Sequence, residues 1–447
     1  MSKHLKNTDD FSLEPLTGGP GGPRSDAPSR RKFLARGGAV MSSVATLGLA
    51  GKALAETAAA APAAAPGADL PPNIPPWTRS LGAPTAKPYG TPSKYESSVI
   101  RHLYPGLTEP MSAYSTSPLQ DLDGIITPNG LFYERHHAGV PQIDPAQHRL
   151  MVHGLVDTPL LFTVDELRQF PSQSRIHFLE CSGNPSFTPP WGKTAAEVCG
   201  LLSCAQWTGV PLKTVLEECG LKPQAKWVIA EGADGAAMDR SIPIEKCLDD
   251  AMLVYSQNGE RLRPEQGYPL RLLVPGFEGN MNVKWLRRLH VTDAPAYTRE
   301  ETAKYTDLLA NGKARKFSFV MECKSLITAP SGTHKLTRKG KHEMRGIAWS
   351  GHGKITNVDV SVDGGDNWYP ATLDAPVLDK ALTAFRAPFD WHGEELMIMS
   401  RAIDETGYVQ PTLQQLIDVR GKVSFYHNNA IQPWKIDANG EVTNGRA

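Results

Sequence analysis

The chain has 447 residues, and its 47 lysines and arginines balance 47 aspartates and glutamates, so the formal net charge is zero. The length allows two or three domains, and a hydrophobic content of 40% is enough for a sizeable core. Beyond residue 55 the chain carries 39 basic and 43 acidic side chains, a balance that argues against a broad nucleic-acid-binding surface.

The spacing of the cysteines argues against the commonest metal and haem motifs. The sequence has no Cys-x-x-Cys, no Cys-x-x-Cys-His and no His-x-His, so neither a covalent c-type haem nor the usual zinc and copper spacings are expected. An even number of cysteines permits disulfides in an exported protein, although a chain of this size does not require them. The six cysteines are Cys181, Cys199, Cys204, Cys219, Cys247 and Cys323.

The first 94 residues have the composition of a targeting region followed by a linker. Ser29-Arg30-Arg31-Lys32-Phe33-Leu34 precedes a weakly apolar stretch that ends in Ala53-Leu54-Ala55. This combination predicts a twin-arginine export signal over residues 1–55 and a periplasmic protein, with a short membrane anchor as the alternative. Residues 56–94 are rich in Ala and Pro and predict a linker or arm. No other run of 18 apolar residues occurs, so the mature form is expected to have no membrane span.

Residues 95–312 form the first predicted domain, in which strand and helix patterns are mixed. Strands are expected at residues 150–156, 227–230, 252–255 and 270–274. A capping box at residues 163–166 opens a short helix, and residues 211–220 predict a helix with Pro early and Gly at its end. Asn258-Gly259 is a strong hairpin signal after the strand at 252–255.

Residues 313–447 form the second predicted domain, in which strands follow one another with little helix. Residues 358–362 alternate between apolar and polar, a Gly-rich turn follows at 363–366, and residues 396–402 form another such strand. Spaced short strands with Gly-rich turns predict an immunoglobulin-like β-sandwich.

A cysteine at the end of an apolar run is the most informative feature of the first domain. Residues 178–180 lead into Cys181, and Ser182-Gly183-Asn184-Pro185 then forces a turn. A side chain at such a junction can face a cleft, where its thiolate would be a soft metal ligand. A small buried packing residue is the alternative for this stretch taken alone.

Four further segments supply groups that suit a large anionic ligand. Residues 132–137 are expected to be a loop offering an arginine and two histidines, and residues 231–235 form a turn with one carboxylate. Arg271 lies in an apolar strand and needs an anionic partner. Glycines in residues 276–285 allow a close approach of the backbone, and Lys284 can meet a phosphate.

Taken together, these motifs resemble those of the sulfite oxidase family of molybdenum enzymes, from about residue 95 to the end of the sequence. The resemblance depends on ordered motifs at residues 135–137, 181–184, 231–234, 267–271, 283–285, 360–365 and 408–411. It implies an α+β protein, with a mixed α/β molybdopterin domain followed by an immunoglobulin-like dimerisation domain.

The family also implies a cofactor and the residues that hold it. One molybdopterin per chain would carry a molybdenum ion, and the thiolate of Cys181 would be the protein ligand of the metal. Arg135, Cys181 and Tyr305 match catalytic positions. The positions that would bind the cofactor are Tyr133, Glu134, Arg135, His136, His137, Asp234, Gln266, Arg271, Asn282, Val283 and Lys284.

Three positions depart from the pattern of many members. Gln266 stands where many have His, and His136 stands where many have Asn. Ser186 stands where animal sulfite oxidases carry a substrate-binding arginine. A pocket with fewer cations suits a less charged sulfur atom than that of free sulfite.

Within the family, the chain most resembles the molybdenum subunits of sulfane dehydrogenases in bacterial thiosulfate oxidation. This resemblance depends on the export signal, the lack of a haem motif, the departures above and residues 426–434. The expected substrate is therefore sulfane sulfur on the cysteine of a carrier protein, with electrons passing to a separate c-type cytochrome. The expected assembly is a homodimer through the C-terminal domain, within a heterotetramer. Two alternatives are a dehydrogenase of free sulfite and, from another class, a non-catalytic exported binding protein.

Overall fold

The computed structural model describes residues 92–447 except 106–111, 186–190, 310, 423–424 and 447. The described residues belong to one compact unit, Lys87–Ala447. The expected signal peptide and nearly all of the expected arm lie outside the described residues. Within those residues, no helix is long and apolar enough to cross a membrane.

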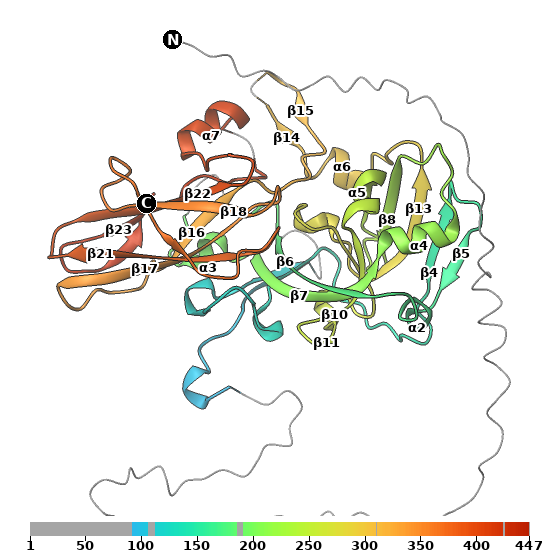
Figure 1. The fold of residues 1–447 in the computed structure, drawn as a ribbon, viewed down its shortest axis with the longest axis horizontal. Coiled ribbons are helices and arrows are strands. Elements are labelled where there is room, and N and C mark those ends of the chain that lie inside the picture. Colours follow the sequence, from blue (N-terminus) through green and yellow to red (C-terminus); the bar gives the residue numbers. More distant parts are fainter. Residues whose placement is uncertain (1–91, 106–111, 186–190, 310, 423–424, 447) are drawn as a thin grey trace, which may run out of the picture. The chain divides into compact units, whose positions relative to one another are not determined.

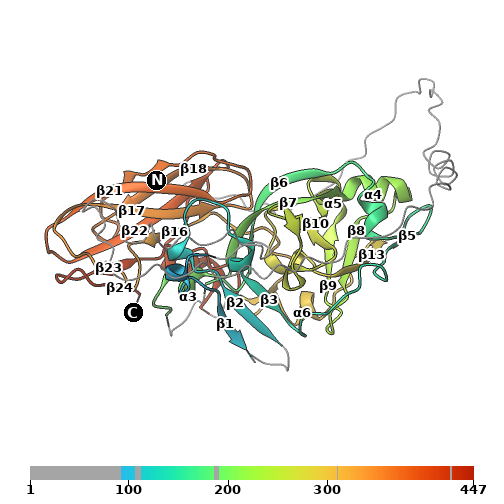
Figure 2. The same ribbon diagram turned by 90° about the horizontal axis from the view of Figure 1, so that it is seen from below.

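Three sheets make up the part of the structure before residue 300. A small sheet has the order β1-β2-β3, and its strands lie side by side in Figure 2. A second has the order β11-β10-β7-β6, with β12 also paired to β10, and a third has the order β5-β4-β13-β8-β9. Their strands are β1 His102–Pro105, β2 Ala113–Thr116, β3 Glu134–His136, β4 Leu150–Gly154, β5 Leu160–Phe162, β6 Gln173–Glu180, β7 Leu202–Pro211, β8 Trp227–Gly232, β9 Asp239–Pro243, β10 Met252–Gln257, β11 Glu260–Arg261, β12 Arg271–Leu273 and β13 Leu286–Thr292.

Short helices connect these strands. The α-helices are α2 Val164–Leu167, α3 Ala195–Cys199, α4 Leu212–Cys219, α5 Ile244–Asp249 and α6 Arg299–Thr302. The 3-10 helices are η2 Lys94–Glu96, η3 Leu119–Asp121, η4 Asn129–Leu131, η5 Pro264–Gln266 and η6 Gly279–Met281.

Local sequence signals explain several of these elements. Thr163 and Glu166 cap each other's backbone N–H groups at the start of α2, as a capping box requires. The turn between β10 and β11 places Asn258 at φ 47° and Gly259 at φ 80°, which is the backbone that Asn-Gly favours in a two-residue hairpin. Helix α4 buries Cys219 with Leu212, Val215 and Leu216, so this cysteine is a packing residue.

The C-terminal part is a β-sandwich, as the strand pattern predicts. One sheet has the order β16-β17-β21-β20 and the other β19-β18-β22-β23-β24; the orange and red strands in Figure 1 show this layered arrangement. The strands are β16 Lys324–Ala329, β17 Gly340–Trp349, β18 Ile355–Ser361, β19 Tyr369–Pro370, β20 Thr372–Leu373, β21 Thr383–Trp391, β22 Leu396–Asp404, β23 Trp434–Ile436 and β24 Val442–Asn444. A separate pair, β14 Asp307–Leu308 and β15 Ala314–Arg315, precedes them.

Two local expectations differ from the structure. Residues 132–137 are not all loop, because Glu134–His136 pairs with β2 as the short strand β3. Helix α7, Leu413–Arg420, follows a capping box at Thr412, although little helix was expected there. The helix buries only Leu416 and Arg420 and exposes 68% of Val419, so its apolar periodicity in the sequence is weak.

The end of strand β6 packs directly against the sandwich. Phe178 and Cys199 belong to the same buried cluster as Trp349 and Trp434. The buried carboxylate of Glu180 accepts hydrogen bonds from Lys324 at 2.5 Å and from the indole of Trp349 at 2.7 Å. Hydrogen bonds from the sandwich therefore fix the position of Glu180, the residue before Cys181.

Candidate active site

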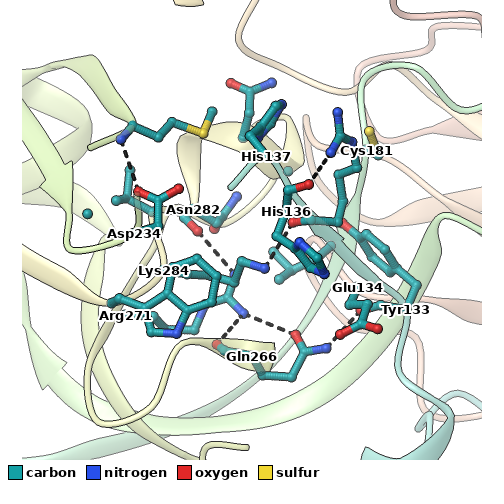
Figure 3. A pocket seen from close by; sticks show the side chains of 18 of the residues that line it. Tyr133, Glu134, His136, His137, Cys181, Asp234, Gln266, Arg271, Asn282 and Lys284 are labelled. Carbon is teal, nitrogen blue, oxygen red and sulfur yellow. Dashed lines mark hydrogen bonds between the residues drawn. The ribbon is translucent and has the colours of Figure 1, made fainter. Parts of the chain in front are cut away.

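One open cavity brings together every site residue predicted from the sequence, around about 680 Å³ of empty space that includes its opening to solvent. Figure 3 shows most of these side chains, with labels from Tyr133 to Lys284, gathered around it. They come from β3, the end of β6, the loop after β8, η5, β12, the segment after η6 and the turn after α6. The cavity is lined by Tyr133, Glu134, Arg135, His136, His137, Cys181, Asp234, Gln266, Arg271, Asn282, Val283, Lys284 and Tyr305, among others.

Cys181 follows the last residue of β6, and its side chain lines the cavity. Its backbone N–H donates to the carbonyl of Leu201 at 3.0 Å, and its carbonyl accepts from the N–H of Asn184 at 3.0 Å. The thiol is not in a disulfide. Burial raises the pKa of the thiol, while the Gly183 N–H and Arg135 act in the opposite direction. A bound cation would favour the thiolate that a metal ligand requires.

Arg135, His137 and Tyr305 form the polar side of the cavity near Cys181. Arg135 donates to the hydroxyl of Ser112 at 3.3 Å and to the carbonyl of His136. Burial, Arg135 and Lys284 lower the pKa of His137 to about 3, so its imidazole is neutral. Its Nε2 is hydrogen-bonded to the Tyr305 hydroxyl at 3.1 Å.

Arg271 is a buried guanidinium without a carboxylate among the described residues. Its terminal nitrogens donate to the carbonyls of Gln266 at 3.0 Å and Asn282 at 3.1 Å, and its Nε has no partner. The guanidinium also lies 5.0 Å from the ring centre of Trp207. Burial lowers the pKa of Arg271 to about 10. A buried cation that is paired only with carbonyl groups is suited to an anionic ligand.

Lys284 provides a second buried cation beside Arg271. Its ammonium donates to the carbonyls of Arg135 at 2.9 Å and Glu265 at 3.0 Å. Burial and the neighbouring Arg271 lower the pKa of Lys284 to about 7. An anion bound between the two cations would restore the charge of Lys284, because opposite charge favours the protonated amine.

Several residues predicted to bind the cofactor form side-chain hydrogen bonds with other parts of the protein. The amide of Asn282 accepts from Val274 N–H at 2.7 Å and donates to the Glu278 carbonyl at 3.2 Å. Gln266 donates to the Tyr133 carbonyl at 2.8 Å, and Asp234 accepts from Met238 N–H at 3.1 Å. These side chains shape the cavity wall, and their contacts with a cofactor stay predictions.

Gly279 and Asn280 are among the further residues that line the cavity. The side chain of Asn280 donates to Ser182 at 3.3 Å, while its Oδ1 is buried without a hydrogen-bond partner. A Cβ on Gly279 would lie 2.8 Å from the Glu180 carbonyl oxygen and 2.9 Å from the Tyr133 hydroxyl, so no larger residue fits. Both belong to the Gly-rich segment 276–285, which was the signal that could have identified them.

The turn expected at residues 231–235 begins later than predicted, because Glu231 and Gly232 are the last residues of β8. Glu231 pairs with Arg287 and Arg288, so Asp234 is the carboxylate of this motif that lines the cavity. Ser186, at which a substrate arginine is absent, lies outside the described residues.

Comparison with known proteins agrees with this arrangement. Residues 137–300 match the family described as oxidoreductase molybdopterin binding domain, and residues 315–433 match the Mo-co oxidoreductase dimerisation domain. The solved structure of the sulfane dehydrogenase SoxCD from Paracoccus pantotrophus is 47% identical, with a TM-score of 0.81. The match covers 83% of this chain and 97% of that one. The chain belongs to the sulfite oxidase family of molybdenum oxidoreductases.

Other members of the sulfite oxidase family match over part of their length. Human mitochondrial sulfite oxidase is 31% identical over 373 residues, which cover 76% of this chain and 67% of the relative. The tomato (Solanum lycopersicum) NADH nitrate reductase is 34% identical over 304 residues, which are 59% of this chain and 33% of the relative. The chain thus spans a third of the nitrate reductase and about two thirds of the sulfite oxidase.

Family membership makes molybdenum bound by molybdopterin the cofactor of this chain, and the cavity fits that group. Arg271 and Lys284 offer two cations for a phosphate, with the unpaired Nε of Arg271 available for a further hydrogen bond. Gly279 lines the same cavity and lets the backbone pack closely against the Glu180 carbonyl, next to the position of Cys181. Cys181 offers the soft ligand that molybdenum accepts.

Proposed function

We propose that this chain is the molybdenum subunit of a periplasmic sulfane dehydrogenase. Its substrate would be sulfane sulfur on the cysteine of a carrier protein, and its electrons would pass to a c-type cytochrome. The observation that carries the proposal is the 47% identity to the sulfane dehydrogenase SoxCD over 97% of that chain. The identity to sulfite oxidase is lower, at 31%.

The residues around the cavity would act by binding and orientation. When bound, the cofactor supplies oxygen-atom transfer to sulfur and accepts two electrons. Arg135 is the cation that would meet negative charge on the reacting sulfur, since it lines the cavity with Cys181. The neutral His137 lies 3.1 Å from the Tyr305 hydroxyl through its Nε2. In the tautomer in which Nε2–H donates to the Tyr305 oxygen, the Tyr305 O–H is available to donate to an oxygen on the substrate.

Steady-state kinetics with two substrates test the proposal. The holoenzyme would be assayed with c-type cytochrome as acceptor, once with sulfane-loaded carrier protein and once with inorganic sulfite, at one ionic strength. We expect a higher kcat/KM for the loaded carrier. A higher value for sulfite would contradict the sulfane assignment and favour the sulfite dehydrogenase, which the similarity to sulfite oxidases supports.

The remaining features of the proposal concern assembly and location. Residues 315–433 match a dimerisation domain, which supports a homodimer through the sandwich; we propose that it lies within a heterotetramer with the cytochrome. The twin-arginine motif at Arg30-Arg31 supports export to the periplasm. Family membership is that of an oxidoreductase, so a non-catalytic binding protein is no longer a candidate.

A further inference from the structure

A segment of the dimerisation domain lies against the turn that carries Cys181. The backbone N–H of His427 donates to the carbonyl of Ser182 at 2.8 Å. A Cβ built on Gly183 would lie 3.3 Å from the ring of Phe425, so the phenyl group rests on the glycine two positions after Cys181. Phe425 is nevertheless 60% exposed. It therefore lies at the outer side of the active-site turn.

Three anchors hold this segment in place. The buried carboxylate of Asp307 accepts hydrogen bonds from the N–H groups of Phe425 at 2.9 Å and Tyr426 at 3.2 Å. The imidazole of His427 lies between two carboxylates, 3.1 Å from Glu322 and 3.5 Å from Glu278. Single exposed aromatic residues are ordinary on protein surfaces, but here the backbone of Phe425 is fixed by a buried carboxylate. The position of the Phe425 ring is therefore preorganised.

An unbroken row of aromatic rings leads from Phe425 into the cavity. The rings of Phe425 and Tyr426 meet edge to face at 5.1 Å, and those of Tyr426 and Tyr305 lie 5.2 Å apart. The Tyr305 hydroxyl reaches His137 at 3.1 Å, and both Tyr305 and His137 line the cavity. We call Phe425, Tyr426 and Tyr305 the aromatic wall.

The aromatic wall is better suited to bind a polypeptide than a small dianion. Free sulfite is recognised by cations and hydrogen-bond donors, and an exposed phenyl group provides neither. A cysteine that carries sulfane sulfur brings methylene and backbone groups with it, and these pack well on aromatic rings. A docked polypeptide would also remove the Phe425 ring from water, which is favourable.

We infer that the aromatic wall binds the cysteine-bearing arm of the carrier protein and that Phe425 is a specificity-determining residue for protein-borne over free sulfur. The inference rests on the proposed function. It assigns to Phe425 a role in substrate binding and none in the chemical step.

The test compares full-length holoenzyme with its Phe425→Ala and Phe425→Tyr variants. Each is assayed with the sulfane-loaded carrier and with sulfite, and molybdenum content and the visible absorption spectrum are recorded. For Phe425→Ala we expect KM for the loaded carrier to rise about tenfold, as for an aromatic anchor at an interface, with kcat little changed. Values for sulfite, molybdenum content and the spectrum should stay as in the wild type.

Two further variants complete the comparison. Phe425→Tyr keeps the ring and should keep the wild-type KM for the loaded carrier. Val419→Ala removes another exposed apolar side chain, 68% exposed on α7, and should change neither substrate's kinetics.

Three results would overturn the inference. An equal loss with both substrates would make Phe425 a structural residue, and unchanged kinetics for the carrier would exclude the contact. If the wild type failed to turn over the loaded carrier, this result would contradict the proposed function, and the inference that rests on it would be wrong as well.

Discussion

Cys181 is the residue whose replacement should separate chemistry from folding. Cys181→Ser exchanges a soft donor for a hydroxyl that is hard and far less acidic. Activity should be lost, while the pterin stays bound through the cations at the other end of the cavity. Pterin fluorescence after release, metal analysis and the metal–sulfur absorption bands would show this. Cys219→Ala, in the core of α4, is the matched control and should keep the absorption bands.

Arg271 should determine how well the cofactor is retained. Arg271→Met keeps much of the side-chain volume but removes a charge-assisted contact worth about 1.5–3 kcal/mol. We expect a lower molybdopterin content per chain in the purified protein. Arg175→Met, on the exposed part of β6, controls for the loss of one positive charge. Equal cofactor content in the Arg271 variant and the wild type would make Arg271 a purely structural residue.

The segment around His427 should make stability depend on pH. Burial disfavours the charge of His427, but Glu322 and Glu278 outweigh it and raise the pKa from 6.5 to about 9. Arg240 and Arg420 are the cations next to these carboxylates. A raised pKa contributes stability that is present below pH 6.5 and is lost as the pH rises through about 9.

Thermal unfolding of the wild type and of His427→Gln would measure this contribution. The wild type should be more stable than the variant by on the order of 3 kcal/mol at pH 6, and the difference should shrink towards pH 9.5. His352→Gln, at an exposed position, should follow the wild type at every pH. A difference that does not vary with pH would show that folding does not raise the pKa of His427.

Strands β6 and β16 are joined by a buried ion pair that should couple the active-site turn to the sandwich. Glu180 and Lys324 are 0% and 3% exposed and lie 2.5 Å apart. Lys324→Met leaves the carboxylate unpaired and should cost about 3–5 kcal/mol of stability. Adding Glu180→Gln should recover part of the loss, because no buried charge then remains. Strictly additive losses in the double variant, measured by thermal unfolding, would contradict the coupling.

Export of the whole protein should depend on the guanidinium groups of Arg30 and Arg31. Replacing both by Lys keeps the charge but not the planar donor geometry. We expect the double variant to accumulate in the cytoplasm, as shown by immunoblots of cell fractions. Arg24→Lys, six residues earlier, should leave export unchanged. Normal periplasmic levels of the double variant would remove the basis for the twin-arginine route.

The elements that were predicted correctly are those formed by interactions between residues close together in the sequence. Asn258-Gly259 determines its hairpin through backbone preference, and Thr163 caps α2 through a side chain three residues from its partner. Strand β3 was expected to be loop, because its pairing with β2 involves residues some 20 positions away. Helix α7 was missed since most of its surface faces water.

The site was predictable in composition and less so in detail. The resemblance to a family identified which residues would gather, and the structure places them around one cavity. The resemblance could not show which side-chain amides are already hydrogen-bonded within the protein. The oxygen of Asn282 accepts from a backbone N–H, whereas the oxygen of Asn280 has no hydrogen-bond partner. The charges around His427 come from segments far apart in the chain, so no spacing in the sequence indicated them.

The contact between His427 and Ser182 bears on the timing of biosynthesis. His427 follows Ser182 by about 245 residues, and at roughly 5–20 residues per second the ribosome needs about 10–50 s to add them. During that interval the turn with Cys181 exists without the segment that closes over it. The outer side of the pocket is therefore completed late in translation. A maturation factor that delivers the cofactor would meet a more open site on the nascent chain than on the finished protein.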